Sequence, residues 1–588
     1  MNAKGYQVLC TFISFILVAV CQSGQKIEEV HQEVAGVRTS QTFLTKTTNT
    51  ANALEGGHLN YGLVADSPFE GILNGVFFEN AYDAEILQFF DEALLATDEN
   101  SQFTQEGAAT YEMSKDYKTM TITIRDGVKW HDGNPVTGED LEFAYLTIGH
   151  PDYNGSRYDT TFQNIIGMDE YHAGKAERIS GIKVNGNRVS LTFKEANPSI
   201  LTGVWTYPLH KKYLRDIPVA QMSASEKIRQ HPIGFGPFKV KKIVQGEAIE
   251  FEAFDEYWKG KPKLDRISLS VVNSTTAVKA LQAGKIDIAK ISADLYEGTK
   301  KLTNVNLLGQ MESTYTYIGF KLGHYDLDKK ENVMGGTKLS DKRVRQAIGY
   351  AINNDEVGRF LYKGLRFQAN TVIPPTQPNY YDASFQGYTY NPEKAKRLLD
   401  EAGYVDRNGD GFREDPKGKK FVLNFASMAG GDAAEPLARY YIQQWRDVGL
   451  YVQLLEGRLH EFNSFYDRLK KDDEKIDLYQ AAFGVGSDPD PSGLWARDAA
   501  FNYTRWVNEK NDELLQKGVS VEAFNNEYRA EVYKEWQALI KEEAPLIPTL
   551  FRYGFLGVNK RVRDLELETG SVYVDWSKVA VTAEKSIK

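Results

Sequence analysis

The close succession of helix, glycine and strand constrains the fold of this chain more than any other feature. Ser274 to Ala283 has the pattern of a helix, Gly284 ends it, and the strand Ile286-Asp287-Ile288 follows at once. A glycine just past the last helical residue is a common helix stop. A strand that follows so closely predicts an α/β architecture.

The same alternation continues elsewhere in the chain. Asn391-Pro392-Glu393 predicts a helix start with a cap, a proline at the first position and an acid in the first turn, and Gly403 predicts its end. Ser340-Asp341 predicts a second capped start. Met120 to Ile124 alternates polar and apolar residues and stops at Asp126-Gly127, which indicates a strand that meets a turn.

Length and composition fit a large globular protein. With 588 residues the chain is long enough for two or three domains. Hydrophobic residues make up 42% and charged residues 26%, as in ordinary soluble proteins. A net charge of -10 argues against a nucleic-acid partner, because nucleic-acid binders normally present a basic face.

The first residues indicate export. Val8 to Val20 is almost wholly apolar but too short for a comfortable membrane span, which is typical of a secretory signal. Val18-Ala19-Val20-Cys21 resembles a bacterial lipoprotein cleavage box, although a valine precedes the cysteine where a small residue is usual. We expect a lipoprotein signal peptide over 1–21, lipidation at Cys21 and a flexible tether over 22–54; the alternative is an ordinary secretory peptide.

Catalytic patterns are missing from the sequence. The nine histidines are scattered with no pair at helical ligand spacing, which argues against zinc. No HExxH, GxSxG, P-loop or GxGxxG motif occurs. Both cysteines, Cys10 and Cys21, lie in the N-terminal segment, so the body has neither a disulfide framework nor a thiolate metal site. We expect a protein that is not an enzyme and needs no cofactor.

One loop has the residue order of a calcium site. Asp406, Asn408 and Asp410-Gly411 follow the DxNxDG order of an EF-hand loop, but Lys417 occupies the closing acid position. These three side chains are candidate metal ligands, and a polar turn is the alternative.

Several motifs, in order, resemble the family 5 extracellular solute-binding proteins. They are ITIRDGVKWHDGNPVTGEDLEFAY (122–145), GFGPFKV and FDEYWKGKPKLDRI (234–267), ALQAGKIDIA (280–289), LSDKRVRQAIGYAINNDEV (339–357) and NPEKAKRLLDEAGY (391–404). The resemblance runs from Glu55 to Arg563. Two further stretches, 166–182 and 323–333, are similar to the oligopeptide-binding lipoproteins of lactic-acid bacteria and streptococci.

The resemblance implies an α/β, two-lobed periplasmic-binding-protein-like fold of type II with an extra subdomain inserted in lobe I. The expected divisions are lobe I at 55–85, 232–313 and 551–588, the inserted subdomain at 86–231, and lobe II at 314–550. Two extended segments that start at Thr314 and Ala544 would cross between the lobes and form a hinge.

The resemblance also implies a function. Receptors of this family capture oligopeptides between hinged lobes and deliver them to the permease subunits of an ABC importer. We expect a monomer, held by its lipid anchor on the extracellular face of a Gram-positive membrane. The alternatives are a receptor for a signalling peptide or a non-peptide solute, and a surface hydrolase or adhesin.

One residue is a candidate ligand contact through the resemblance. In many peptide receptors of the family an aspartate in a motif like GW-x-x-D-x-x-D/E-P pairs with the α-ammonium of the peptide. The matching stretch is FGVGSDPDPSGLW, from Phe483 to Trp495, and Asp488 is the nearest counterpart. A different alignment places Asp488-Pro489 on the closing acid-proline pair, which leaves an acidic turn with no ammonium partner.

Overall fold

A computed structural model describes residues 27–588 apart from 35–36, 99–101, 487 and 569–573, with side chains from residue 43 onward. The signal peptide and Cys21 lie outside the described residues, so the lipidation of Cys21 stays a prediction. Among the described residues, no helix has both the length and the apolar character needed to cross a bilayer.

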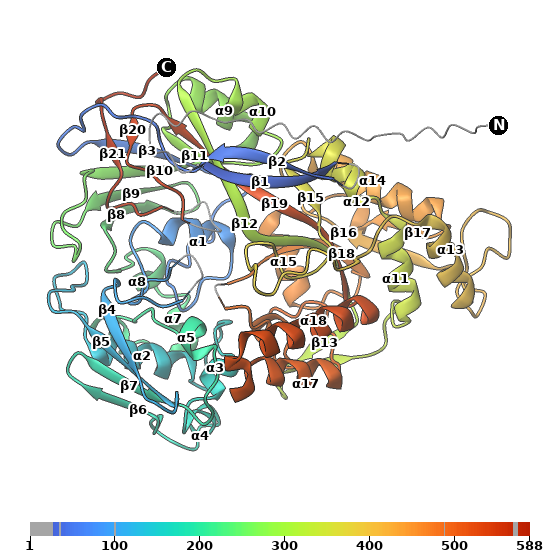
Figure 1. Ribbon diagram of the computed structural model, residues 1–588, viewed down its shortest axis with the longest axis horizontal. Helices are drawn as coiled ribbons and strands as arrows, with labels where there is room; N and C mark the ends of the chain where they lie inside the picture. Colours follow the sequence, from blue (N-terminus) through green and yellow to red (C-terminus); the bar gives the residue numbers. More distant parts are fainter. Residues whose placement is uncertain (1–26, 35–36, 99–101, 487, 569–573) are drawn as a thin grey trace, which may run out of the picture.

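One large sheet runs through the molecule, and thirteen strands of the described chain belong to it. Its centre is an antiparallel pair of long strands, β12 (Val305–Phe320) and β19 (Leu546–Asn559). Figure 1 shows this pair passing from one half of the molecule to the other. Their pairing is irregular between Met311 and Tyr315. The two segments expected to cross between lobes therefore lie side by side in one sheet.

The half of the molecule at upper left in Figure 1 continues the sheet from β19. In order, its strands are β11 (Ile288–Ile291), β3 (His58–Val64), β10 (Arg266–Val272), β9 (Ala248–Ala253) and β8 (Phe238–Val244). Alternate apolar residues such as Leu59, Leu269 and Phe251 are buried in its core. Helix α9 (Ser274–Gln282) precedes β11, and Gly284 between them has a φ of 63°. The predicted helix and its glycine stop are confirmed, and the strand begins at Ile288, two residues later than predicted.

The other half extends from β12 through β18 (Leu478–Gly484) and β16 (Val422–Ala426) to β17 (Tyr451–Leu454). Its long helices are α11 (Lys342–Ala351), α13 (Pro392–Glu401), α14 (Ala434–Asp447), α15 (Phe462–Lys470), α17 (Glu509–Gly518) and α18 (Asn526–Glu543). Asp341 caps α11, and Asn391 caps α13 by accepting from the Lys394 N–H at 2.9 Å. Both predicted helix starts are confirmed.

A separate four-stranded sheet lies within the span expected for the inserted subdomain. Its order is β4 (Ala109–Met113), β5 (Thr119–Ile124), β7 (Arg188–Thr192) and β6 (Ile182–Asn185), with helix α2 (Gly138–Ile148) beside it. Its buried apolar residues form a cluster of their own. This unit is at lower left in Figure 1.

The N-terminal segment differs from the expected flexible tether over 22–54. Strands β1 (Ile27–Val34) and β2 (Val37–Leu44) pair antiparallel, and Leu44 also pairs with Leu308 of β12. Phe43 is buried with its ring 5.1 Å from the ring of Phe555. The prediction missed this because it relied on the polar composition of the segment, whereas a single buried aromatic side chain and backbone pairing hold it to the body.

Candidate ligand-binding cavity

A cavity of about 530 Å³ lies between the four-stranded unit and the helical half of the molecule. We call its two sides the first wall and the second wall. The first wall consists mainly of residues 156–161 and 202–207, and the second wall of residues 484–486, 488–496 and 498–501. The second wall begins where β18 ends at Gly484. Ligands of open α/β sheets commonly bind beyond strand ends of this kind.

The structure places Asp488 in the second wall but pairs it with the protein's own cation. Its carboxylate accepts from the guanidinium of Arg529, on α18, at 3.2 Å. Arg529 is 3% exposed and also donates to the Ser199 hydroxyl, which lies close in sequence to the first wall, at 2.9 Å. Burial lowers the pKa of Arg529, but the charge of Asp488 more than offsets this, so Arg529 is a firm cation. The role of Asp488 as an ammonium partner stays a prediction.

Asp490 supports the next turn of the same loop. Its carboxylate accepts from the Ser492 N–H at 3.1 Å and from the Ser492 hydroxyl at 2.6 Å. Such Asx turns are a usual device before a short helix, here α16 (Ser492–Trp495). Burial raises the pKa of Asp490 to about 6, and the charge of Asp488 adds to the effect.

Asp159 is a carboxylate of the first wall that the sequence patterns did not indicate as functional. It caps the short helix α3 (Thr160–Gln163) by accepting from the N–H groups of Thr161 at 2.9 Å and Phe162 at 3.3 Å. Burial raises the pKa of Asp159 to about 7, and the charge of Asp490 raises it further. Its only sequence signal was that of an ordinary helix cap before two threonines.

Aromatic side chains fill much of the remaining lining. Trp205, Tyr207, Tyr315 and Trp495 all line the cavity. The Tyr315 side chain, from the central strand β12, is 1% exposed. Its hydroxyl has no hydrogen-bond partner within the described part of the chain, although the Trp495 indole lies nearby. Aromatic rings with a polar group suit a ligand that has both apolar side chains and amides.

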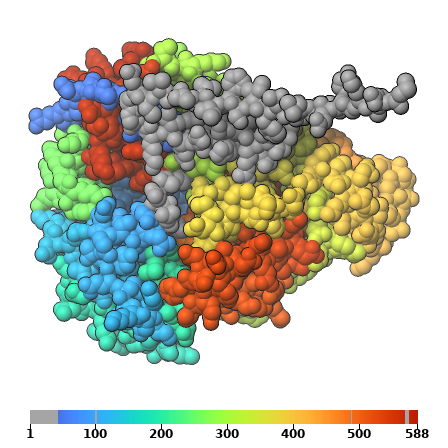
Figure 2. All heavy atoms as spheres, in the orientation of Figure 1, coloured from blue at the N-terminus to red at the C-terminus, as the bar shows by residue number. Residues whose placement is uncertain are grey.

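Hydrogen bonds join the segments on the two sides of the cavity, so this is a closed arrangement. Besides the Arg529–Ser199 bond, Gln163 at the end of α3, next to the first wall, donates to Asp498 of the second wall at 2.6 Å. Outside the cavity, Lys330 donates to the Pro151 carbonyl at 3.2 Å. Figure 2 shows the corresponding seam, where the segments around residues 100–200 meet those around 500–540.

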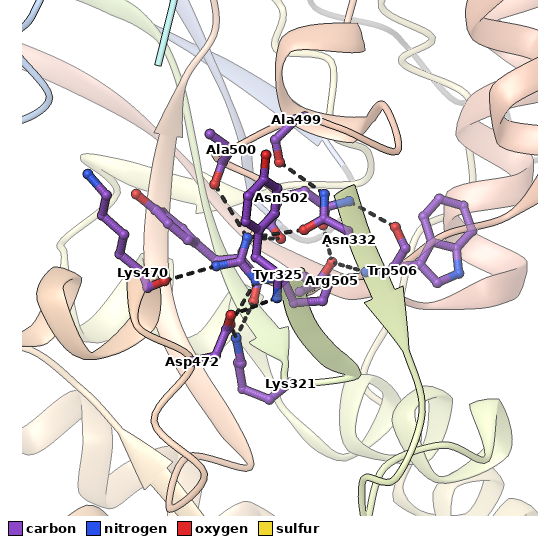
Figure 3. A network of polar contacts seen from close by, with 12 residues as sticks. Lys321, Tyr325, Asn332, Lys470, Asp472, Ala499, Ala500, Asn502, Arg505 and Trp506 are labelled. Atoms are coloured by element: carbon purple, nitrogen blue, oxygen red, sulfur yellow. Dashed lines mark hydrogen bonds and ion pairs between the residues drawn. The ribbon is translucent and has the colours of Figure 1, made fainter. Parts of the chain in front are cut away.

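A buried polar network holds the second wall in place (Figure 3). Asp472 forms ion pairs with Lys321 and with Arg505, the latter at 2.7 Å. Arg505 donates to the Asn332 amide oxygen at 3.1 Å, and Asn332 in turn donates to the Ala499 carbonyl in the cavity lining at 3.1 Å. Burial lowers the pKa of Lys321 to about 8 even though Asp472 opposes the shift. These bonds therefore fix the position of the second wall.

The predicted calcium loop lies between α13 and β16, and none of its residues lines the cavity. Asp406 accepts from the Gly409 N–H at 2.7 Å, and the Asn408 amide donates to Glu414 at 2.7 Å. Carboxylate oxygens of Asp406, Asp410 and Glu414 lie within 4.8 Å of one another. The sequence reading missed Glu414 because it followed EF-hand spacing. The same hydrogen bonds would form in a polar turn that binds no metal, so the metal assignment stays a prediction.

The chain is similar to known proteins both in sequence and in structure. Residues 102–505 match the family model described as bacterial extracellular solute-binding proteins, family 5 Middle. The oligopeptide-binding protein OppA of Lactococcus lactis subsp. cremoris (strain SK11) is 35% identical over 507 residues, which is 84% of each chain.

Two solved structures have the same fold. Lactococcal OppA complexed with an endogenous peptide in the closed conformation matches with a TM-score of 0.86 at 34% identity, over 90% of this chain and 100% of that one. AppA from Bacillus subtilis in complex with a nonapeptide matches with a TM-score of 0.78 at 24% identity, with the same coverage of both chains. At that lower identity the likeness shows the fold alone.

Proposed function

Because the chain belongs to the bacterial extracellular solute-binding proteins of family 5, we propose that it captures oligopeptides in the cavity between the two walls and delivers them to an ABC importer. The observation that carries the proposal is the cavity itself, about 530 Å³, which lies between the four-stranded unit and the helical half of the molecule. The likeness to a peptide-bound closed relative supports the same reading.

The lining suits capture of peptides with varied sequence. A volume of this size is within the range of small-molecule sites, about 300–1,000 Å³. The backbone of a short peptide can exchange hydrogen bonds with polar groups and trapped water, while its side chains pack on the aromatic rings. Closure of the walls then shields these bonds from solvent and keeps the ligand in place until delivery.

The finer parts of the proposal concern location and assembly. The protein acts as a monomer on the extracellular face of a Gram-positive membrane, anchored through a lipid on Cys21, and it docks on the permease subunits of its importer. We also propose that the two lobes divide near residues 314 and 550. It binds without catalysis.

The test is mass spectrometry of material extracted from the purified, denatured protein. We expect a mixture of short peptides in near-stoichiometric amount. If the extract holds a metal chelate or a haem instead, the ligand class is wrong. If it holds no ligand, and the refolded protein binds none from a peptide library, the capture function is wrong.

A further inference from the structure

A hairpin of the helical half reaches across the seam to the four-stranded unit. Its strands are β13 (Gly323–Asp326) and β14 (Glu331–Met334), which pair antiparallel. From the turn between them, the Lys330 ammonium donates to the Pro151 carbonyl at 3.2 Å and to Nε2 of His172 at 3.4 Å. The turn of the hairpin therefore joins the two halves of the molecule outside the cavity.

The hairpin is held firmly at its base. Asp472, in the buried polar network of Figure 3, accepts from the Tyr325 N–H at 2.8 Å. On the other strand, Asn332 accepts from the Arg505 guanidinium at 3.1 Å and donates to the Ala499 carbonyl at 3.1 Å. Both strands are thus tied to the network that fixes the second wall, so we expect the turn to move together with that wall.

Lys330 reaches the other half from an unusual backbone conformation. Its φ is 55°, in the left-handed region, where a lysine costs free energy. The turn is exposed, and the Leu327 side chain within it is 81% exposed, so packing of the turn does not explain this conformation. Backbone strain persists where other contacts hold it and is found at ligand clamps and switches. The bonds of the Lys330 ammonium across the seam are contacts of this kind.

His172 can accept from Lys330 only while its ring is neutral. It ends helix α4 (Met168–His172), and its Nδ1 lies 3.0 Å from the Gly149 carbonyl oxygen. Because a carbonyl can only accept, Nδ1 carries the ring proton, and Nε2 offers its lone pair to Lys330. If His172 takes up a second proton, Nε2 becomes a donor and two positive charges face each other across 3.4 Å.

His172 also supports the first wall of the cavity. Its ring stacks on the ring of Tyr158, with the centroids 4.0 Å apart and the planes at 12°. Tyr158 lines the cavity. The bonds to Gly149 and Lys330 fix the orientation of the His172 ring, and the ring in turn supports Tyr158. His172 is therefore a positioning residue, which acts on a ligand through Tyr158.

The charged groups around His172 come from both halves of the molecule. Burial lowers the pKa of His172 below its ordinary value of 6.5, and the charge of Lys330 adds to this, while the Gly149 carbonyl, Asp169 and Asp498 oppose it. Lys330 has a larger effect than Asp498, and both belong to the helical half. Separation of the halves thus removes a net lowering effect and part of the burial, so opening raises the pKa of His172. Protonation of His172 therefore favours the open arrangement.

We propose that the β13–β14 hairpin is a pH-sensitive clasp, in which Lys330 closes on neutral His172, supports Tyr158 of the first wall through it, and lets go when His172 is protonated. This inference rests on the proposed peptide-binding function. The closed arrangement is favoured above the ordinary pKa of histidine and weakens as pH falls through it. Because Lys330 is exposed, its contact contributes little free energy, and we expect a change in peptide affinity of about threefold.

Three variants distinguish the clasp from a purely structural contact. Lys330→Met removes the ammonium group and keeps an unbranched side chain. His172→Gln replaces the ring by an amide whose oxygen can accept from Lys330 but which does not titrate. Lys329→Met is the matched control, because this lysine of the same turn pairs with Asp326 of its own hairpin at 3.4 Å.

The probe is the synthetic peptide Ala-Leu-Phe-Leu-Ala, measured by calorimetry at pH 7.0 and pH 5.5, between which its terminal charges hardly change. Over this interval the wild-type protein and Lys329→Met should lose about threefold more affinity than Lys330→Met and His172→Gln do. The other histidines titrate in all four proteins, so this difference comes from the clasp. At pH 7.0, Lys330→Met should also bind about threefold more weakly than wild type.

Spin labels report on the clasp without any ligand. They are attached to Leu327→Cys, in the hairpin turn, and to Lys175→Cys, just past α4, in the full chain with Cys10→Ser and Cys21→Ser, which removes its own two cysteines. The measurement is the distribution of distances between the labels at pH 7.0 and pH 5.5. We expect the share of longer distances to rise at pH 5.5 in the otherwise unchanged chain and to be independent of pH when His172→Gln is added.

The outcomes separate the clasp from the proposed function. If His172→Gln or Lys330→Met keeps the pH dependence of wild type in both measurements, the clasp does not exist although peptide binding stands. The same conclusion holds if Lys329→Met loses the pH dependence as Lys330→Met does. If no peptide binds the wild-type protein while the label distances respond to pH through His172, the clasp stands and the proposed function fails.

Discussion

The pairing of Asp488 with Arg529 leads to a prediction that the family motif alone would not give. In the variant Asp488→Asn the Arg529 guanidinium loses its counter-ion while 3% exposed. Breaking a buried ion pair typically costs about 3–5 kcal/mol. Arg529 keeps its bonds to the Ser199 hydroxyl and the Gly518 carbonyl, both at 2.9 Å, so we expect a value near the lower end, about 3 kcal/mol of unfolding free energy.

The double variant Asp488→Asn/Arg529→Met isolates the pair. Because it removes both charges, its loss of unfolding free energy should be about 2 kcal/mol smaller than the sum of the losses in the two single variants. Urea unfolding followed by tryptophan fluorescence is a suitable assay, since Trp495 and Trp536 pack 6.1 Å apart in the same core. The ratio of affinities for free and N-acetylated peptides should be the same in Asp488→Asn as in wild type.

One result would refute this reasoning directly. If Asp488→Asn leaves the unfolding transition in place but weakens binding of free peptides alone, by about 2–5 kcal/mol, then Asp488 is the ammonium partner that the motif indicated. In that case the Asp488 carboxylate would have to separate from the Arg529 guanidinium when the ligand binds. A crystal structure of the complex would show the carboxylate turned toward the peptide.

Three further predictions follow. Cys21→Ala should release the protein from cells into the medium, because the predicted diacyl anchor contributes about 0.8 kcal/mol per buried methylene; unchanged retention, measured by immunoblot of cells and medium, would contradict the lipid anchor. A peptide incubated with the protein should be recovered intact, and time-dependent cleavage in a peptidase-free preparation would show an enzyme. Burial would raise the pKa of Glu312, but the cations of Arg552 and Lys290 hold it at about 2. The charge of Glu312 therefore stabilises the fold by about 3 kcal/mol above pH 4.5, and this stabilisation is lost as pH falls toward 2. Glu312→Gln should remove this part of the pH dependence of urea unfolding. If the variant keeps the same pH dependence, the ion pairs of Glu312 with Arg552 and Lys290 are not its source.

Local features explain which parts of the fold the sequence predicted well. The starts of α11 and α13 depend on an Asp341 or Asn391 side chain that bonds to an N–H two or three residues later, so the whole interaction lies within one short stretch. The same holds for Gly284 after α9. Such interactions need no knowledge of the tertiary structure.

The cavity could not be predicted in the same way. Asp488 and Arg529 are 41 residues apart, and Ser199 is 330 residues from Arg529. The motif predicts that Asp488 contacts the ligand, but it contains no information about the Arg529 guanidinium, which comes from a distant helix. Asp159 is the opposite case, since locally it is an ordinary cap, and the meeting of the two walls brings the charges of Asp490 and Asp488 near it.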